Sequence, residues 1–254
     1  NIPNDVATRN IYEPNASVNR KNTTPFQPEF DDLSRLHYII IKRKITTILE
    51  FGVGKSTSIL GNALQINKSR HLNYTSKNLR RNNLFECHSI DNHYKWIEEC
   101  KKTIPKDLIT DKIVNLHLSN LYTSTFNNRI CTYYDPLPNI CPDLIYLDGP
   151  DQFSPKESIR GISTKHEDRM PMAADILSFE HFLQPGTLII VDGRTANARF
   201  LQCNLQRNWA HFYSEEWDQH FFEMQESPLG IYNQRMLDYC LGDEYYKRLP
   251  EKKD

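Results

Sequence analysis

The chain has 254 residues, of which 39% are hydrophobic and 25% charged, a composition typical of a globular domain and not of a disordered chain. Its 31 Lys and Arg residues nearly balance its 32 Asp and Glu residues, for a formal net charge of −1. Proteins that hold nucleic acid through its phosphates usually carry an excess of basic residues, so we expect no nucleic-acid partner. No apolar run approaches the roughly 20 residues of a membrane-spanning helix, so we expect no membrane contact.

The cysteines indicate a reducing compartment. They are scattered, form no C-x-x-C pair and have no histidine cluster beside them, so a structural zinc site is not expected. Buried, reduced thiols of this kind are typical of a cytosolic protein, and we therefore expect a cytoplasmic location.

Strands alternate with helices along most of the chain. An irregular arm rich in Asn, Thr and Pro is predicted over residues 1–30, a single domain over 31–230, and a C-terminal helix with a charged tail over 231–254. The alternation predicts a mainly parallel sheet, and two late strands joined by a short polar turn predict an antiparallel edge. The predicted helices are 31–43, 56–64, 93–103, 169–183, 195–207 and 232–241; the predicted strands are 45–51, 85–91, 112–118, 143–148, 187–192, 209–214 and 220–226.

The first predicted strand ends in an acid that two glycines and a new helix follow. Glu50 closes the strand, Gly52 and Gly54 allow a tight turn, and Ser56 and Thr57 begin the helix. Such a turn brings the N–H groups of a helix N-terminus close to a ligand. It is not a phosphate-binding P-loop, which needs a glycine five residues before Gly54, nor a complete dinucleotide motif, whose third glycine is replaced by Thr57. Taken alone, the segment fits a ligand site and an empty tight turn equally well.

A second acid, Asp91, ends the next predicted strand and has Asn92 beside it. In nucleoside-binding α/β folds an acid at this place accepts hydrogen bonds from ribose hydroxyls. The alternative is that Asp91 caps the helix that begins near His93. The combination with Glu50 and the two glycines favours the ribose role.

Four segments in this order and spacing resemble the class I S-adenosylmethionine-dependent methyltransferases. Glu50–Gly54 is similar to the acid-x-Gly-x-Gly turn beneath the cofactor, and Asp91 to the ribose-binding acid. Residues 142–150 and 183–192 resemble the fourth strand and the turn with the fifth strand, so the likeness covers about 45–226. It implies a Rossmann-like class I methyltransferase fold, with a mainly parallel seven-stranded sheet, an antiparallel C-terminal edge and helices on both faces.

The same resemblance implies S-adenosylmethionine as the cofactor. The residues that would hold it are Glu50, Gly52, Gly54, Ser56, Thr57, Asp91, Asn92 and Asp148. The chain departs from the pattern in two places. Ser56 and Thr57 replace the usual third small residue of the turn, and residues 120–139 are longer than a plain crossover, with room for an extra hairpin.

Asp148 and Asp192 end two central strands, and we expect both carboxylates to project into one cleft at the carboxyl edge of the sheet. They could hold a divalent metal, as in the metal-dependent O-methyltransferase branch that these strand ends also resemble. One of them could act as a general base, or both could only position the ligands. Gly193 stands where the metal branch has an amide, so a metal is possible but not favoured.

Substrate selection is expected in the polar loop 152–172 and just after the fifth strand. Arg160, Arg169 and Arg194 are candidates to bind an anionic group on the substrate, and His166 is a further candidate base. The alternative for each loop residue is a solvated surface position.

The resemblance favours O-methylation of a small molecule or sugar. The Asn/Asp-Pro-Pro-aromatic motif of the enzymes that N-methylate adenine or cytosine is absent, because the corresponding place reads Asp148–Asp151. Two alternatives stay open. One is an aminopropyl-transferase-like enzyme that uses the decarboxylated cofactor, and the other is a non-catalytic module that binds the cofactor. The sequence also leaves a homo-oligomer open.

Overall fold

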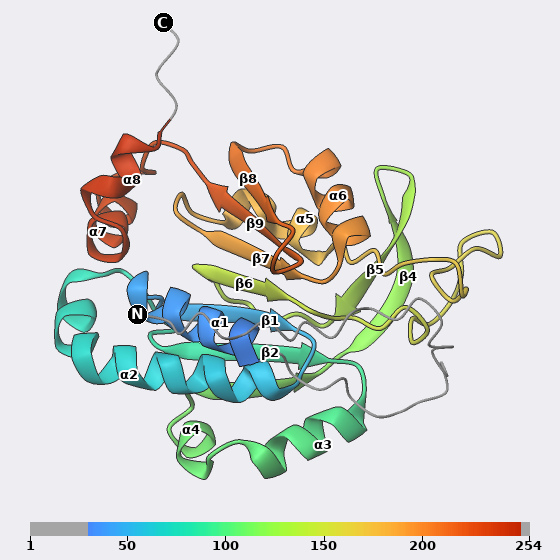
Figure 1. The fold of residues 1–254 in the computed structure, drawn as a ribbon, viewed down its shortest axis with the longest axis horizontal. Coiled ribbons are helices and arrows are strands. Elements are labelled where there is room, and N and C mark those ends of the chain that lie inside the picture. The colour runs from blue at the N-terminus through green and yellow to red at the C-terminus, as the bar shows by residue number, and fades with distance from the viewer. Residues whose placement is uncertain (1–29, 250–254) are drawn as a thin grey trace, which may run out of the picture.

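The computed structural model describes residues 30–249, so the arm predicted over 1–30 lies almost wholly outside the described residues, as does the end of the charged tail. Seven strands form one sheet in the order β3-β2-β1-β6-β7-β9-β8 (Figure 1). The strands are β1 Thr47–Phe51, β2 Glu86–Asp91, β3 Val114–Leu118, β6 Leu144–Leu147, β7 Leu188–Asp192, β8 Trp209–Ser214 and β9 Gln219–Met224.

The pairing confirms the predicted fold class. Every neighbouring pair from β3 to β7 is parallel, whereas β9 runs antiparallel to both β7 and β8. The helices are α1 Phe30–Lys42, α2 Lys55–Asn78, α3 Tyr94–Thr103, α4 Lys106–Thr110, α5 Asp175–Phe179, α6 Thr195–Asn204, α7 Ile231–Cys240 and α8 Asp243–Lys247, with a short 3₁₀ helix, η1, at Glu180–Phe182.

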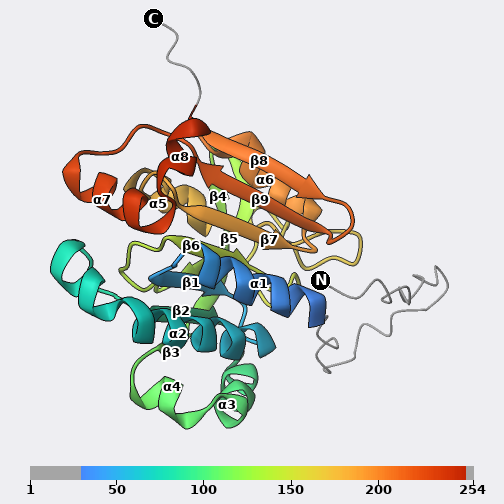
Figure 2. The same cartoon turned by 60° about the vertical axis from the view of Figure 1, so that its left-hand side comes forward.

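Both faces of the sheet are covered by apolar side chains, because the residues of each buried strand alternate between the two faces. On one face, Ile48 of β1 belongs to a core with residues of α1 and α2, such as Leu36 and Leu60. On the other face, Leu49 belongs to a core with residues of α5 and α6, such as Ile176. Figures 1 and 2 both show α3 and α4 beside the β3 edge, with β8 at the opposite edge. No helix within residues 30–249 is long and apolar enough to cross a bilayer.

The second helix is much longer than predicted. The sequence predicts a helix over 56–64 and an insertion or a second helix after it, whereas α2 continues unbroken to Asn78. Its buried Asn67 donates hydrogen bonds to the carbonyl oxygens of Ile40 and Ile45, both 3.0 Å away. These bonds fasten the middle of α2 to the connection between α1 and β1.

The extra hairpin for which residues 120–139 leave room is present. It consists of β4 Asn120–Phe126 and β5 Arg129–Asp135, an antiparallel pair separate from the main sheet. This hairpin also explains why the helix predicted over 169–183 is present only in its second half. Residues 172–174 hydrogen-bond Thr132 of β5 in an extended segment, because Thr132 N–H donates to Met172 O at 2.8 Å and Ala174 N–H donates to Thr132 O at 3.0 Å. Only α5 and η1 remain helical.

Candidate functional site

The strand registers bring the predicted acids to one edge of the sheet. Phe51 pairs with Ile90 on one side and with Leu147 on the other, and Leu147 pairs with Val191. The residues that follow these four positions, Gly52, Asp91, Asp148 and Asp192, are therefore level with one another at the carboxyl ends of the strands. Ligands of open α/β sheets bind at this edge.

The turns after β1 and β6 touch backbone to backbone. Gly52 has a φ of +96°, which favours glycine, and a Cβ placed there would lie 2.8 Å from Gly149 N. A Cβ on Gly149 would in turn lie 2.7 Å from Gly52 Cα. Neither turn has room for a side chain, so the two glycines set the spacing between the Glu50–Gly54 turn and Asp148.

Glu50 is buried next to the glycine turn and stabilises it through hydrogen bonds. It has no accessible surface, and its two carboxylate oxygens accept hydrogen bonds from Ser56 Oγ at 2.6 Å and Thr57 Oγ1 at 2.7 Å. Burial raises the pKa of Glu50 to about 7, although the hydroxyl hydrogen bonds oppose this rise. Thr57 Oγ1 also accepts the N–H of Gly54 at 3.1 Å. Glu50, Ser56 and Thr57 thus form a buried hydrogen-bonded group that shapes the turn, and their contact with a cofactor stays a prediction.

Gly54 and Asp91 lie on either side of the end of the glycine turn, where the sequence predicts contact with a ligand. Beside Gly54, which caps the N-terminus of α2, a Cβ would meet nothing nearer than Ser56 Oγ at 3.9 Å, so the space there is open. Asp91 accepts the N–H of Val53 at 3.0 Å and that of His93 at 2.7 Å, which fixes its carboxylate between the glycine turn and the start of α3. Each oxygen retains a lone pair for a ligand hydroxyl. The N-cap of α3 is His93, so Asp91 does not cap this helix, and its geometry is compatible with ligand binding.

Asp148 is the accessible acid of the strand-end pair, with 51% of its side-chain surface exposed. Desolvation by the surrounding protein raises the pKa of Asp148 to about 6; the Arg194 guanidinium opposes the rise and the Asp192 carboxylate adds to it. Arg194 donates to the carbonyl oxygens of Asp148 and, at 2.8 Å, of Pro150, and its Nε lies 3.7 Å from Asp148 Oδ1. Arg194 therefore holds the 148–150 turn through Nη1 and Nη2, whereas its buried Nε has no hydrogen-bond partner.

Asp192 has both oxygens occupied by protein donors. Tyr146 OH donates to Oδ2, and Gln219 Nε2 donates to Oδ1 at 3.0 Å. Arg35 Nη1 in turn donates to Gln219 Oε1 at 3.1 Å, which connects α1 to the same network. Sequence reasoning missed Tyr146, Gln219 and Arg35 as partners of this network. For Gln219 the reason is that only the pairing of β9 against β7 places it opposite Asp192.

The loop candidates lie on the surface. Arg160 sits at an exposed tight turn between Ile159 and Ile162, and Arg169 donates to Ser163 O at 2.6 Å. His166 has 52% of its side-chain surface exposed and accepts the N–H of Asp168 on Nδ1. Within residues 30–249, no hydrogen bond or ion pair joins these three side chains to Asp148 or Asp192. Asn92 is nearer the strand ends and accepts a 3.4 Å hydrogen bond from Ser154 at the start of this loop.

The described part of the chain contains no group of three or more His, Cys, Asp or Glu side chains arranged to hold a metal ion. Asp148 and Asp192 alone supply two carboxylates, and both oxygens of Asp192 already accept hydrogen bonds.

No family model and no curated protein matches the chain. Solved structures that resemble it include the O-methyltransferase TomG from Streptomyces achromogenes in complex with SAM, at 12% identity and a TM-score of 0.41, over 78% of this chain and 81% of that one. A putative caffeoyl-CoA O-methyltransferase from Staphylococcus aureus has 13% identity and a TM-score of 0.42, over 79% and 85%. An O-methyltransferase from Bacillus cereus in complex with SAH has 11% identity and a TM-score of 0.42, over 78% and 82%. Similarity at this level assigns no activity to the present chain.

Proposed function

We propose that this protein is an S-adenosylmethionine-dependent methyltransferase that methylates an oxygen of a small molecule or sugar. One observation carries the proposal: the glycine turn, Asp91, Asp148 and Asp192 all lie side by side at the carboxyl ends of neighbouring strands of the seven-stranded sheet. The sequence resemblance of the same segments to the class I methyltransferases supports it.

The residues at this edge fit the cofactor. The open space beside Gly54 admits a ligand to the backbone of the turn, and the lone pairs left on Asp91 suit the two hydroxyls of a ribose. When bound, S-adenosylmethionine supplies a methyl group that its sulfonium already activates. The protein then has to align the acceptor and remove the proton of its hydroxyl.

We assign the proton transfer to Asp148. Its accessible carboxylate and a pKa of about 6 make it able to take a proton from an acceptor hydroxyl near neutral pH. Asp192 is held by Tyr146 and Gln219, so its part is to orient the acceptor beside Asp148. Arg194 fixes the turn that carries Asp148, which makes it a positioning residue.

A methyl-transfer assay tests the proposal. Tritium-labelled S-adenosylmethionine would be incubated with the purified protein and a panel of phenols, sugars and hydroxy acids, and label in the acceptor would be counted. We expect Asp148→Asn to lower kcat about 100-fold while the cofactor affinity stays within about threefold. Asp168→Asn, an exposed acid of the neighbouring loop, is the matched control. Equal turnover by the wild-type protein and Asp148→Asn would remove Asp148 from the reaction.

We also propose a cytoplasmic location. All six cysteines are free thiols, three of them buried, as expected in a reducing compartment. The absence of a nucleic-acid partner stays a prediction. A homo-oligomer stays an open possibility.

A further inference from the structure

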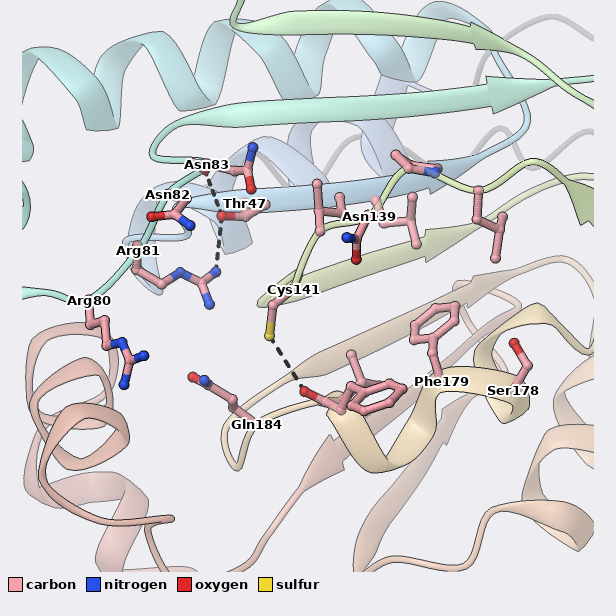
Figure 3. Close-up of a pocket in the computed structure, with 16 residues that line it drawn as sticks. Thr47, Arg80, Arg81, Asn82, Asn83, Asn139, Cys141, Ser178, Phe179 and Gln184 are labelled. Atoms are coloured by element: carbon pink, nitrogen blue, oxygen red, sulfur yellow. Dashed lines mark hydrogen bonds between the residues drawn. The ribbon is translucent and has the colours of Figure 1, made fainter.

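A cavity opens at the amino-terminal ends of the central strands, on the side of the sheet away from the candidate active site. It has a volume of about 670 Å³, within the range of small-molecule sites. Thr47, at the start of β1, lines it, whereas the candidate active site begins at Gly52 beyond the other end of the same strand. Five residues of a strand span about 16 Å, so the two places are distinct. Figure 3 shows Arg80 and Arg81 reaching toward the space that Cys141 and Gln184 border.

The polar wall of this cavity is positively charged. Two arginines line it, and no Asp or Glu does so among the described residues. Arg81 is fixed: its side chain is 7% exposed, it donates to Thr47 Oγ1 at 3.0 Å, and it lies 3.6 Å from Asp143 Oδ1. The Asp143 carboxylate also accepts the N–H groups of Thr46 at 2.9 Å and Thr47 at 2.7 Å, so it is held in place and partly offsets the charge of Arg81.

Arg80 adds a second charge with no acid beside it. Its guanidinium lies 5.1 Å from the ring centre of Tyr232, and within residues 30–249 no carboxylate lies within ion-pair distance of it. An exposed guanidinium over an aromatic ring has donors free for an incoming anion. Asn82, also in the lining, adds a side-chain amide beside the two arginines.

The other wall is apolar. Phe179 and Phe182 come from the segment of α5 and η1, and Leu137 and Ile140 from the approach to β6. Phe182 is 81% exposed, so most of its ring is open to solvent. A flat or acyl group lying against this wall would cover apolar surface that water now contacts.

Because one wall carries two arginines and the other is apolar, we infer that the cavity is a second ligand site. It is specific for an amphipathic organic anion, that is, an aromatic or acyl body that carries one carboxylate, sulfonate or phosphate group. The apolar body lies against Phe179 and Phe182, and the anionic group lies between Arg80 and Arg81. This site is independent of the proposed methyl transfer at the other edge of the sheet.

A fluorescence titration tests the site with 1-anilinonaphthalene-8-sulfonate, a dye with an aromatic body and one sulfonate. We expect saturable binding that Arg80→Glu and Phe182→Ala each weaken about fivefold, since each change removes about 1 kcal/mol. Arg80→Lys should retain most of the affinity, because it keeps the charge. The matched controls are Arg70→Glu on the exposed surface of α2 and Phe212→Ala on β8, and both should bind within about twofold of the wild-type protein. Thermal melts would verify that each variant is folded.

The charge requirement is checked with N-phenyl-1-naphthylamine, which has the aromatic body without the sulfonate and should bind more weakly. S-adenosylhomocysteine should not displace the sulfonate dye. The inference is overturned by any of three results: no saturable binding, equal binding by all variants, or equally tight binding of the neutral dye. Displacement by S-adenosylhomocysteine would assign the dye to the strand-end site and would also overturn it.

Discussion

Replacing Glu50 by Gln tests how the glycine turn is built. Burial raises the pKa of Glu50 from 4.5 to about 7, so between these pH values the folded protein keeps a proton that the unfolded chain has released. The folded state then binds more protons, and the linkage relation makes stability fall as pH rises through this window. The rise of the Glu50 pKa from 4.5 to about 7, at roughly 1.4 kcal/mol for each pKa unit, corresponds to a loss of about 3 kcal/mol in the free energy of unfolding across this pH window.

Urea denaturation at pH 5, 6, 7 and 8 measures this effect. Glutamine keeps an acceptor for one hydroxyl of the Ser56–Thr57 pair and does not titrate, so the variant should lack the Glu50 part of the pH dependence. The buried carboxyl of Asp175, whose pKa burial also raises to about 7, contributes equally to both proteins and cancels in the difference. Glu216→Gln, in the exposed turn between β8 and β9, is the control. A difference in unfolding free energy between wild type and Glu50→Gln that stays constant from pH 5 to pH 7 would refute the reasoning.

Three other predictions follow from the geometry. Gly52→Ala should lower the unfolding free energy by about 2 kcal/mol, because of its positive φ and the approach of Gly149 N; urea denaturation checks this, and an unchanged midpoint would contradict it. Asp143→Ala should cost about 3 kcal/mol in the same assay, because it leaves Arg81 and the Thr46 N–H uncompensated; a loss below 1 kcal/mol would show that the network does not matter. The rate of methyl transfer should rise with pH around 6, as Asp148 loses its proton, and a flat profile from pH 5 to 7 would argue against Asp148 as the base.

The sheet was predictable because its strands carry a strong local signal. Apolar runs such as 187–192 are too short for helices, and Gly or Pro bounds them, so the observed strands lie within a few residues of the predicted ones. The acids at the strand ends were predictable for the same reason. Once a parallel sheet is inferred, its topology places Asp91, Asp148 and Asp192 at one edge.

The parts that sequence reasoning missed depend on contacts between distant segments. The helix predicted over 169–183 has a suitable local pattern, but hydrogen bonds to Thr132 of the hairpin hold residues 172–174 extended. The part of α2 beyond the predicted helix is fastened by Asn67, whose hydrogen-bond partners lie more than 20 residues away. Gln219 reaches Asp192 only through the antiparallel register of β9, which no local pattern reveals.

Calorimetric titration with S-adenosylmethionine and S-adenosylhomocysteine, with and without magnesium, measures whether the protein binds the proposed cofactor. We predict that both ligands bind the wild-type protein in the micromolar range without a magnesium requirement. Asp91→Ala should weaken binding about tenfold to 100-fold, as expected for a charged hydrogen-bond acceptor, whereas the surface variant Asp111→Ala should bind like the wild type. A folded protein that binds neither ligand would contradict the account, and equal binding by Asp91→Ala would contradict the role given to Asp91.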